Sequence, residues 1–152
     1  MEAFWGQFGL ALPLGLGAIG SALGIGAAGQ AASGAWAREA RAGKPLNFAY
    51  VILVGFPLSQ TIYGAILMLI GMRAPVYTEA VMLANAGALL SIGLAGGLAQ
   101  LLSAWMQGKV GAAAIRALAD GEGQGLAFMI IALGITETVG LFGFVFLLMV
   151  LP

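Results

Sequence analysis

Glu137 is the only charged residue in an apolar run that covers residues 128–151. A charge at bilayer depth costs at least ~2.5–3.5 kcal/mol, so an ionisable residue there is a candidate functional residue by default. The nearest acid or base along the chain is Glu122, which lies outside the run. We therefore expect Glu137 to be protonated, to bind a cation, or to meet a polar partner from another helix. Each of these outcomes predicts a role in ion handling, and a merely structural acid is the alternative.

A small set of other polar side chains lies at a similar depth in the apolar stretches. The set comprises Ser59, Gln60, Thr61, Tyr63, Gln100, Gln107, Thr136 and Thr138. Pro57 removes a backbone donor and frees the carbonyl of Leu53, and carbonyls near such a kink can bind cations. A carboxylate with amide, hydroxyl and carbonyl oxygens suits a hard cation such as Na⁺. The alternatives are that Ser59 and Thr138 bond to their own helices and that Gln60 makes an interhelical hydrogen bond.

The composition predicts an all-α protein that crosses a membrane several times. Of its 152 residues, 61% are hydrophobic and 8% are charged, and the mean hydropathy is +1.03. A spanning helix needs ~20 apolar residues, and four stretches qualify: about 8–37, 48–72, 80–107 (or to 118) and 126–151. The first begins after Glu2 and lacks a clear cleavage site, so we interpret it as a retained helix. The absence of cysteine and histidine excludes disulfides, thiolate chemistry, and metal sites or proton relays that use histidine. The sequence also has no basic tract that would indicate nucleic-acid binding.

The positions of lysine and arginine predict the orientation in the membrane. The first connection carries Arg38, Arg41 and Lys44, and the third carries Arg116, whereas the middle one has only Arg73. Cytoplasmic loops carry an excess of such residues. We therefore expect the first and third connections in the cytoplasm and both termini outside the cell (plasma) membrane.

An internal duplication is predicted by a shift of 79 residues, which aligns the two halves without a gap and places Glu137 on Leu58. The same shift places Gly17 on Gly96 and Gly64 on Gly143. Chance matches among 25 glycines are the alternative. We expect two tandem helical hairpins of the same orientation, residues 1–79 without a membrane carboxylate and residues 80–152 with Glu137.

Glycine is concentrated in the first and third apolar stretches. Small residues let membrane helices approach closely, and glycine costs ~1 kcal/mol against alanine in an exposed helix, so this density needs a packing reason. We expect helices one and three to form the inner layer of a homo-oligomeric ring, with helices two and four facing lipid. Ordinary packing in a monomeric four-helix bundle is the alternative.

Several strings together resemble the K subunit of bacterial V-type (V/A-type) ATPases, a duplicated rotor-ring proteolipid. They are the glycine-rich segment 15–29, the string Phe-Pro-Leu-Ser-Gln at 56–60, Tyr-Gly at 63–64, Gln-Gly-Lys-Val at 107–110 and Thr-Glu-Thr at 136–138. The resemblance covers essentially the whole chain. It implies that Glu137 carries the ion and that, as in sodium-type members, Gln60, Ser59, Gln107 and the Phe56 carbonyl complete the site. Tyr63 matches a tyrosine that hydrogen-bonds the glutamate, and Thr136 and Thr138 flank it.

Two departures from the resemblance are modest. Ser59 stands where sodium-type members often have threonine, which keeps the hydroxyl. Phe56 replaces an aliphatic residue but contributes only its carbonyl.

The resemblance also implies a non-catalytic subunit that transports Na⁺ (or H⁺) and holds no organic cofactor. The expected partners are identical subunits in a ring, a central stalk at the loops 38–44 and 116–122, the lipid bilayer, and a stator subunit whose arginine faces Glu137. Na⁺ is favoured because buried amides are costly without partners. The alternatives are a proton-carrying ring, a small secondary transporter using Glu137, which would predict inverted repeats, and a structural packing protein.

Overall fold

The computed structural model describes residues 2–73 and 75–152, with side chains from residue 4 onward. Its elements are α1 (Glu2–Arg41), α2 (Ala49–Gly55), the short 3₁₀ helix η1 (Phe56–Leu58), α3 (Ser59–Gly71), α4 (Glu79–Ala84), α5 (Ala86–Asp120) and α6 (Leu126–Met149). Within the described residues, four helical segments are long and apolar enough to cross a membrane: Phe4–Arg41, Ala49–Gly71, Ala86–Asp120 and Leu126–Met149. The predicted all-α fold with four membrane spans is confirmed.

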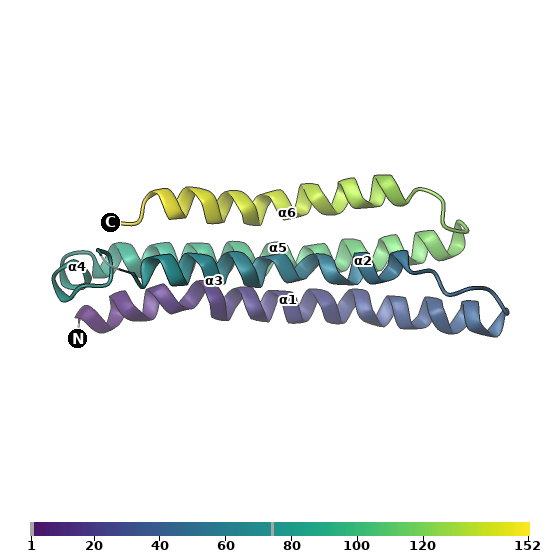
Figure 1. Cartoon of the computed structure of the whole chain (residues 1–152), viewed down its shortest axis with the longest axis horizontal. Coiled ribbons are helices and arrows are strands. Elements are labelled where there is room, and N and C mark those ends of the chain that lie inside the picture. Colours follow the sequence, from purple (N-terminus) through teal and green to yellow (C-terminus); the bar gives the residue numbers. More distant parts are fainter. Residues whose placement is uncertain (1, 74) are drawn as a thin grey trace.

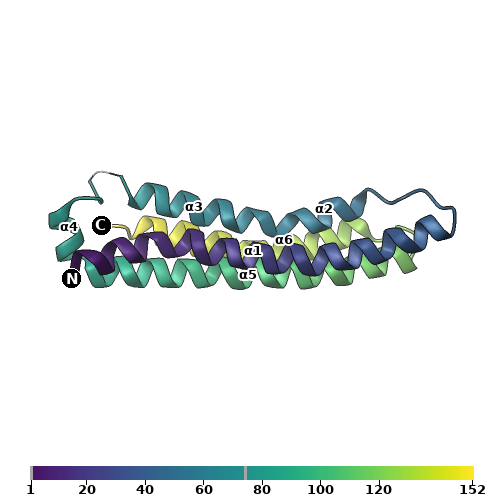
Figure 2. The same cartoon turned by 90° about the horizontal axis from the view of Figure 1, so that it is seen from below.

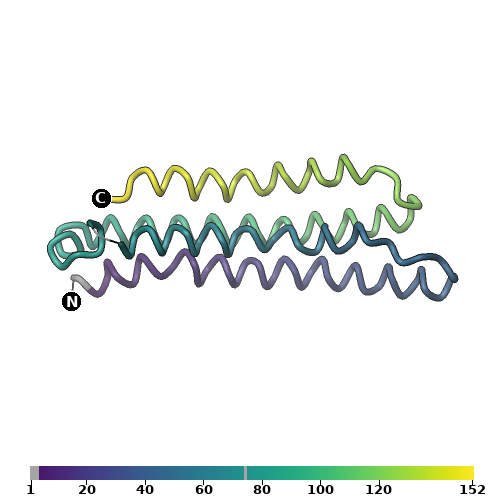
Figure 3. The backbone as a smooth tube through the Cα atoms, viewed as in Figure 1, coloured from purple at the N-terminus to yellow at the C-terminus, as the bar shows by residue number. Residues whose placement is uncertain are grey.

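The helices form one elongated bundle (Figures 1 and 2). Both chain termini lie at the same end as α4, and the two loops after α1 and α5 lie together at the opposite end, as the backbone trace in Figure 3 also shows. We call this second end the loop end. Gly9 of α1 packs on Gly93 of α5, and Gly24 packs on Gly108 further along. Because contacting residue numbers rise together, α1 and α5 run parallel.

The most extensive helix pairing joins α1 and α5, and their backbones meet at glycines. A Cβ atom added at Gly20 would lie 2.5 Å from the Leu101 Cα, and one added at Gly24 would collide with the Ala104 carbonyl oxygen. No side chain larger than hydrogen fits at these two positions without a backbone shift. The predicted close approach of the two glycine-rich helices therefore occurs within a single chain.

The second span is interrupted where Pro57 occurs. η1 separates α2 from α3, and Pro57 stands in its first turn, where a residue without an N–H is tolerated. The Leu53 carbonyl oxygen, which Pro57 cannot bond in an α-helical pattern, faces Gly111 of α5, where a Cβ would be 2.9 Å away. The break thus shapes the contact between the second span and α5.

The third span begins later than its apolar run predicts. Residues 79–84 form the separate helix α4, whose first turn is capped by the Thr78 hydroxyl accepting from the Val81 amide at 3.3 Å. Asn85 leaves the helical conformation, and its side-chain amide donates to the Val81 carbonyl at 3.1 Å. Asparagine competes for backbone groups in this way, so the expected start at residue 80 is wrong and α5 starts at Ala86. Its far end reaches Asp120, beyond both expected limits.

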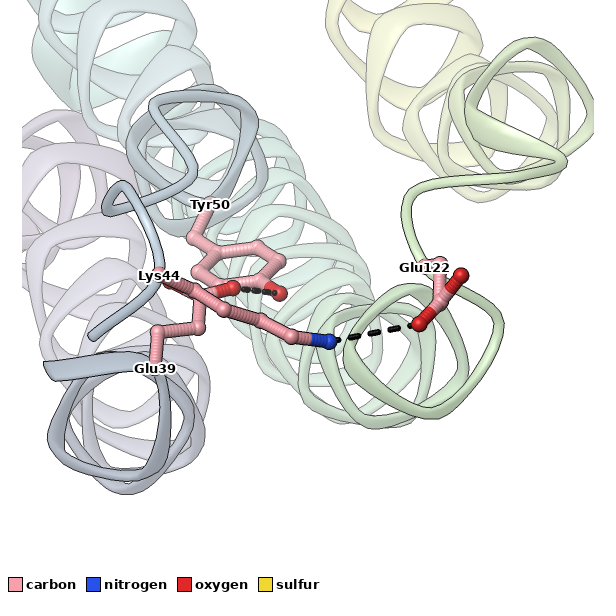
Figure 4. Close-up of polar contacts among 4 residues, drawn as sticks. All are labelled: Glu39, Lys44, Tyr50 and Glu122. Carbon is pink, nitrogen blue, oxygen red and sulfur yellow. Dashed lines mark hydrogen bonds and ion pairs between the residues drawn. The ribbon is translucent and has the colours of Figure 1, made fainter. Parts of the chain in front are cut away.

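Polar contacts at the loop end connect the end of α1 and its following loop to the end of α5 and its following loop. The Lys44 ammonium lies 3.2 Å from Glu122, and Arg38 lies 3.6 Å from Asp120. Close by, the Tyr50 hydroxyl donates to Glu39 at 2.7 Å (Figure 4). Exposed ion pairs stabilise by only ~0.2–1 kcal/mol each, so they align the two loops rather than hold the bundle together.

Candidate ion-binding site

Glu137 lies in the middle of α6 and is half-buried. The Tyr63 hydroxyl of α3 donates to its Oε1 atom at 3.0 Å. The Tyr63 ring stacks on Phe144 of α6 with centroids 5.5 Å apart and an interplanar angle of 16°. One carboxylate oxygen is therefore held from the neighbouring span, by a tyrosine whose ring is itself fixed by α6.

Two of the predicted ligands, Gln60 of α3 and Gln107 of α5, are fully buried and meet at a third residue, Ser103. The Gln60 Nε2 atom lies 2.9 Å from the Ser103 Oγ, and the Gln107 Nε2 atom lies 3.3 Å from it. Ser103 donates in turn to the Thr136 carbonyl of α6 at 2.8 Å. These contacts connect α3, α5 and α6 one residue before Glu137.

Ser59 adds a hydroxyl beside the side-chain amide of Gln60. Its Oγ lies 3.1 Å from the Phe56 carbonyl oxygen and 3.2 Å from the Gln60 Oε1. A hydroxyl has a single proton, so it can satisfy only one of these two oxygens fully at a time. The structure therefore brings two predicted ligands, the Phe56 carbonyl and Gln60, each within hydrogen-bonding distance of a third, Ser59.

Two amide oxygens lack partners among the described residues. They are the Oε1 atoms of Gln107 and Gln100. A buried acceptor without a partner costs ~1–3 kcal/mol, which favours a ligand for it. The Gln107 oxygen belongs to the amide that Ser103 holds, so the donor set fits a hard cation. Gln100 instead uses its nitrogen to hold the Gly140 carbonyl of α6 at 2.8 Å.

The structure does not join all of the predicted residues. In the described part of the chain, the hydrogen bond of Glu137 goes to Tyr63 and none links it to Gln60, Gln107 or Ser59. The Thr136 and Thr138 hydroxyls bond to their own helix, at 2.8 Å to the Leu133 carbonyl and 2.7 Å to the Gly134 carbonyl respectively. Thr136 is linked to the amides of Gln60 and Gln107, which we call the amide pair, through its carbonyl, which accepts from Ser103. Its side chain takes no part in that link.

Gly140 lets α6 approach the amide pair. A Cβ atom at this position would lie 2.9 Å from both the Gln60 Nε2 and the Ser103 Oγ. Such contacts are shorter than real Cβ atoms make, so one of the neighbouring groups would have to move. Glycine here keeps the Glu137 segment against the two glutamines.

Sequence reasoning missed Ser103 and the role of Gln100. One signal was present for Ser103, because it precedes Gln107 by four residues and residues at that spacing share a helix face. A second polar cluster was also missed in the first hairpin. There, the buried Ser21 donates to the Pro57 carbonyl at 2.5 Å, and Thr61 donates to Ser21 at 2.8 Å.

The charge of the site limits the ion that it can hold. No group of three His, Cys, Asp or Glu side chains that could hold a metal occurs in residues 2–73 and 75–152. Among the residues whose side chains the structure describes, Glu137 is the only acid close to Gln60 and Gln107, and the other groups there are neutral. One carboxylate balances one monovalent cation or one proton, whereas a divalent ion would leave a net charge at bilayer depth.

Comparison with known proteins places the chain in a family. No curated protein matches the chain. The family model of the ATP synthase C subunit matches residues 8–71 and 90–150, which is most of the sequence. Members of this family are non-catalytic, ion-translocating rotor subunits of rotary ATPases, and they form homo-oligomeric rings. The chain, with its four apolar helices, thus belongs to the ATP synthase C subunit family.

Proposed function

We propose that this rotor subunit belongs to a bacterial V-type (V/A-type) ATPase and carries Na⁺. Glu137, Gln60, Gln107, Ser59 and the Phe56 carbonyl are the proposed ligands. Family membership supports the rotor role, and the finer assignment depends on the residues of this chain. The observation that carries it is the buried Gln107 oxygen, which has no partner among the described residues.

The choice of Na⁺ over H⁺ depends on the neutral oxygen atoms near the carboxylate. A proton needs one carboxyl group, whereas Na⁺ needs several oxygens around it. Two fully buried amides, linked through Ser103 to the carbonyl of the residue before Glu137, would be costly additions to a proton site. As ligands of Na⁺ they have a use, and the bound ion neutralises Glu137.

The ion-binding cycle follows from that neutralisation. With Na⁺ bound, the Glu137 segment has no net charge and can face lipid as the ring turns. α6 is the least buried of the four spans, which suits a helix that meets lipid and stator in turn. We expect a stator arginine to pair with Glu137, displace Na⁺ and release it, because two cations at one carboxylate would leave a net positive charge at bilayer depth.

Carbodiimide labelling tests the sodium assignment. Purified rings are treated at fixed pH and ionic strength with increasing Na⁺, and with K⁺ as the matched control, while modification of Glu137 is followed by mass spectrometry. We expect Na⁺ to slow labelling strongly and K⁺ to slow it little. Equal labelling rates in both salts would contradict the sodium assignment and favour a proton-carrying ring.

The proposal includes two tandem hairpins, 1–79 and 80–152, with both loops in the cytoplasm and both termini outside. Two observations support it. The family model matches one segment in each half, and the loops lie at one end, joined by Lys44 and Glu122. A secondary transporter built on inverted repeats is less well supported, since α1 and α5 run parallel.

We further propose that the loop end docks the central stalk. Cysteines introduced at Arg41 and Glu122 should crosslink to stalk proteins in the assembled complex. A cysteine at Thr78, at the opposite end of the bundle, is the matched control. Crosslinking from Thr78 instead would mean that the orientation in the membrane is inverted.

A further inference from the structure

We infer that Ser103 is a positioning residue that makes both glutamine amides present their oxygens, rather than their nitrogens, to the ion. The inference rests on the proposed sodium site. Ser103 has an exposed fraction of only 4%, and its hydroxyl touches three different helices through hydrogen bonds. Its Oγ atom lies within hydrogen-bonding distance of the Gln60 Nε2 atom, the Gln107 Nε2 atom and the Thr136 carbonyl oxygen.

The argument starts from what a hydroxyl can do. A serine hydroxyl has one proton to donate and two lone pairs that accept. The Thr136 carbonyl, 2.8 Å from Oγ, can only accept, so the single proton of Ser103 points to it. Toward the other two neighbours Ser103 can only accept. Both amides must therefore turn their NH₂ groups toward Ser103, at 2.9 Å and 3.3 Å.

The orientation of each amide nitrogen determines where the oxygen of the same amide points, and the oxygen is the atom that can bind a cation. Nitrogen and oxygen lie on the same carbon atom, so fixing the nitrogen directs the oxygen away from Ser103. The Gln60 oxygen then meets the Ser59 hydroxyl at 3.2 Å, and the Gln107 oxygen has no partner in the described part of the chain. An amide flipped by half a turn would present its partly positive NH₂ group to the cation and repel it.

The Ser103 proton points to the Thr136 carbonyl only if α6 lies close to α5. Gly140 provides that approach, because any Cβ there would press on Ser103 and Gln60. The backbone of the helix that carries Glu137 thus determines how the two glutamines are turned. Ser103 acts through the glutamines and makes no hydrogen bond to Glu137 among the described residues.

The test is the Na⁺ concentration that gives half-protection of Glu137 against carbodiimide. Loss of a residue that orients metal ligands typically costs 10–100-fold in affinity, so Ser103→Ala should raise this concentration by about 10–100-fold. The pH dependence of labelling without Na⁺ should not change, because the carboxyl group keeps its own contacts. Ser103→Cys fills the same space with a weaker acceptor and should shift affinity in the same direction, which keeps the test usable if Ser103→Ala rings fail to assemble.

Ser21→Ala is the matched control. Ser21 has an exposed fraction of 3% and also donates to a carbonyl of the next span, but among the described residues its donor is the Thr61 hydroxyl and not an amide nitrogen. Its loss should leave the half-protective Na⁺ concentration near that of the unmodified ring. A second check uses Gln107→Ala as the starting chain, in which Ser103→Ala should cost less than it does in the original sequence.

The outcomes separate the inference from the proposal beneath it. If Na⁺ does not protect the unmodified ring, the sodium function fails and the role of Ser103 fails with it. If the unmodified ring is protected and Ser103→Ala is protected equally, only the inference is overturned. Equal shifts in Ser103→Ala and Ser21→Ala would likewise overturn it, because they would indicate a general packing effect.

Discussion

The two hairpins each place one buried serine of a glycine-rich helix against a carbonyl of the following span. In the first hairpin, Ser21 donates to Pro57 at 2.5 Å, and in the second, Ser103 donates to Thr136 at 2.8 Å. Pro57 and Thr136 occupy the same position under the shift of 79 residues that places Leu58 on Glu137. Both hairpins thus have a serine bonded to the carbonyl at this position, although the two serines are not equivalent, since Ser21 falls on Gln100. The carboxylate is present in only one hairpin.

The difference lies in what surrounds each serine. Under that shift, four polar residues of the site have apolar counterparts, whereas Ser59 falls on the polar Thr138. Gln60, Ser103, Gln107 and Glu137 correspond to Val139, Gly24, Ala28 and Leu58. The comparison teaches that a serine–carbonyl bond between spans is a packing device, and that two amides and a carboxylate added around it create a candidate ion site.

The largest effect, a loss of ring assembly, should follow from introducing into the first hairpin a residue of the second. Gly24→Ser introduces the residue that stands at the equivalent position 103. Its Cβ would collide with the Ala104 carbonyl and lie 2.8 Å from the Pro57 Cβ, so we expect loss of assembled rings on native gels. Gly26→Ser is the control, since a Cβ there meets nothing within 4 Å in the chain. Normal rings from Gly24→Ser would mean that α1 and α5 do not pack as described.

The next effect concerns the carboxylate that only one hairpin has. Glu137→Gln should abolish ion translocation by the reconstituted complex while rings still assemble, because the amide keeps the shape but cannot balance a cation. Adding Leu58→Glu to this variant moves the acid to the other hairpin, where the counterparts of the glutamines are Val139 and Ala28. Carbodiimide should then label residue 58 equally with and without Na⁺. Protection by Na⁺ at residue 58 would refute the proposed role of the amides.

A smaller effect should separate the two buried glutamines of α5. Gln107→Ala should raise the half-protective Na⁺ concentration about tenfold or more, since it removes a proposed ligand. Gln100→Ala removes the hydrogen bond to Gly140 and should lower the thermal stability of the ring while changing Na⁺ affinity less. If the two variants weaken Na⁺ binding equally, the free oxygen of Gln107 has no special role.

The smallest effect expected is at Tyr63. Tyr63→Phe removes the donor 3.0 Å from Glu137 but keeps a ring to stack on Phe144. A hydrogen bond to a charged group contributes ~1.5–3 kcal/mol, but Tyr63 can make this bond in both the empty and the occupied site. Only the difference between the two states changes the Na⁺ affinity, so we expect a loss of less than about tenfold, smaller than that of Gln107→Ala. Thr138→Val, which changes a hydroxyl bonded only to Gly134 among the described residues, should leave protection unchanged. A larger change for Thr138→Val than for Tyr63→Phe would contradict this geometry.

The sequence predicted the fold well because its signals are long and redundant. Four apolar stretches and one membrane acid need no tertiary information to be recognised. The error at the start of the third span came from Asn85, a single residue whose side-chain bond to Val81 interrupts an apolar run. Composition alone does not reveal a break of that kind.

The site was less predictable where it depends on contacts between spans. Gln60 and Gln107 stood out because amides are rare in such stretches, whereas Ser103 did not, since serine in a membrane helix commonly bonds to its own backbone. Its actual acceptor, the Thr136 carbonyl, lies on a helix 33 residues away along the chain. Close packing of α5 and α6, which Gly140 permits, brings the two together, and no local sequence pattern encodes that approach.

A single carboxylate for every four membrane helices also determines how many ions a rotor of given size carries per revolution. The circumference of a ring depends on how many helices it contains, whereas the number of ions carried per revolution depends on how many carboxylates it has. A ring with one acid per two hairpins carries half the ions per turn of an equally wide ring with an acid in each. Moving one charge against 100 mV costs about 2.3 kcal/mol, so the same rotary work, spread over fewer ions, can drive each one against twice the electrochemical gradient.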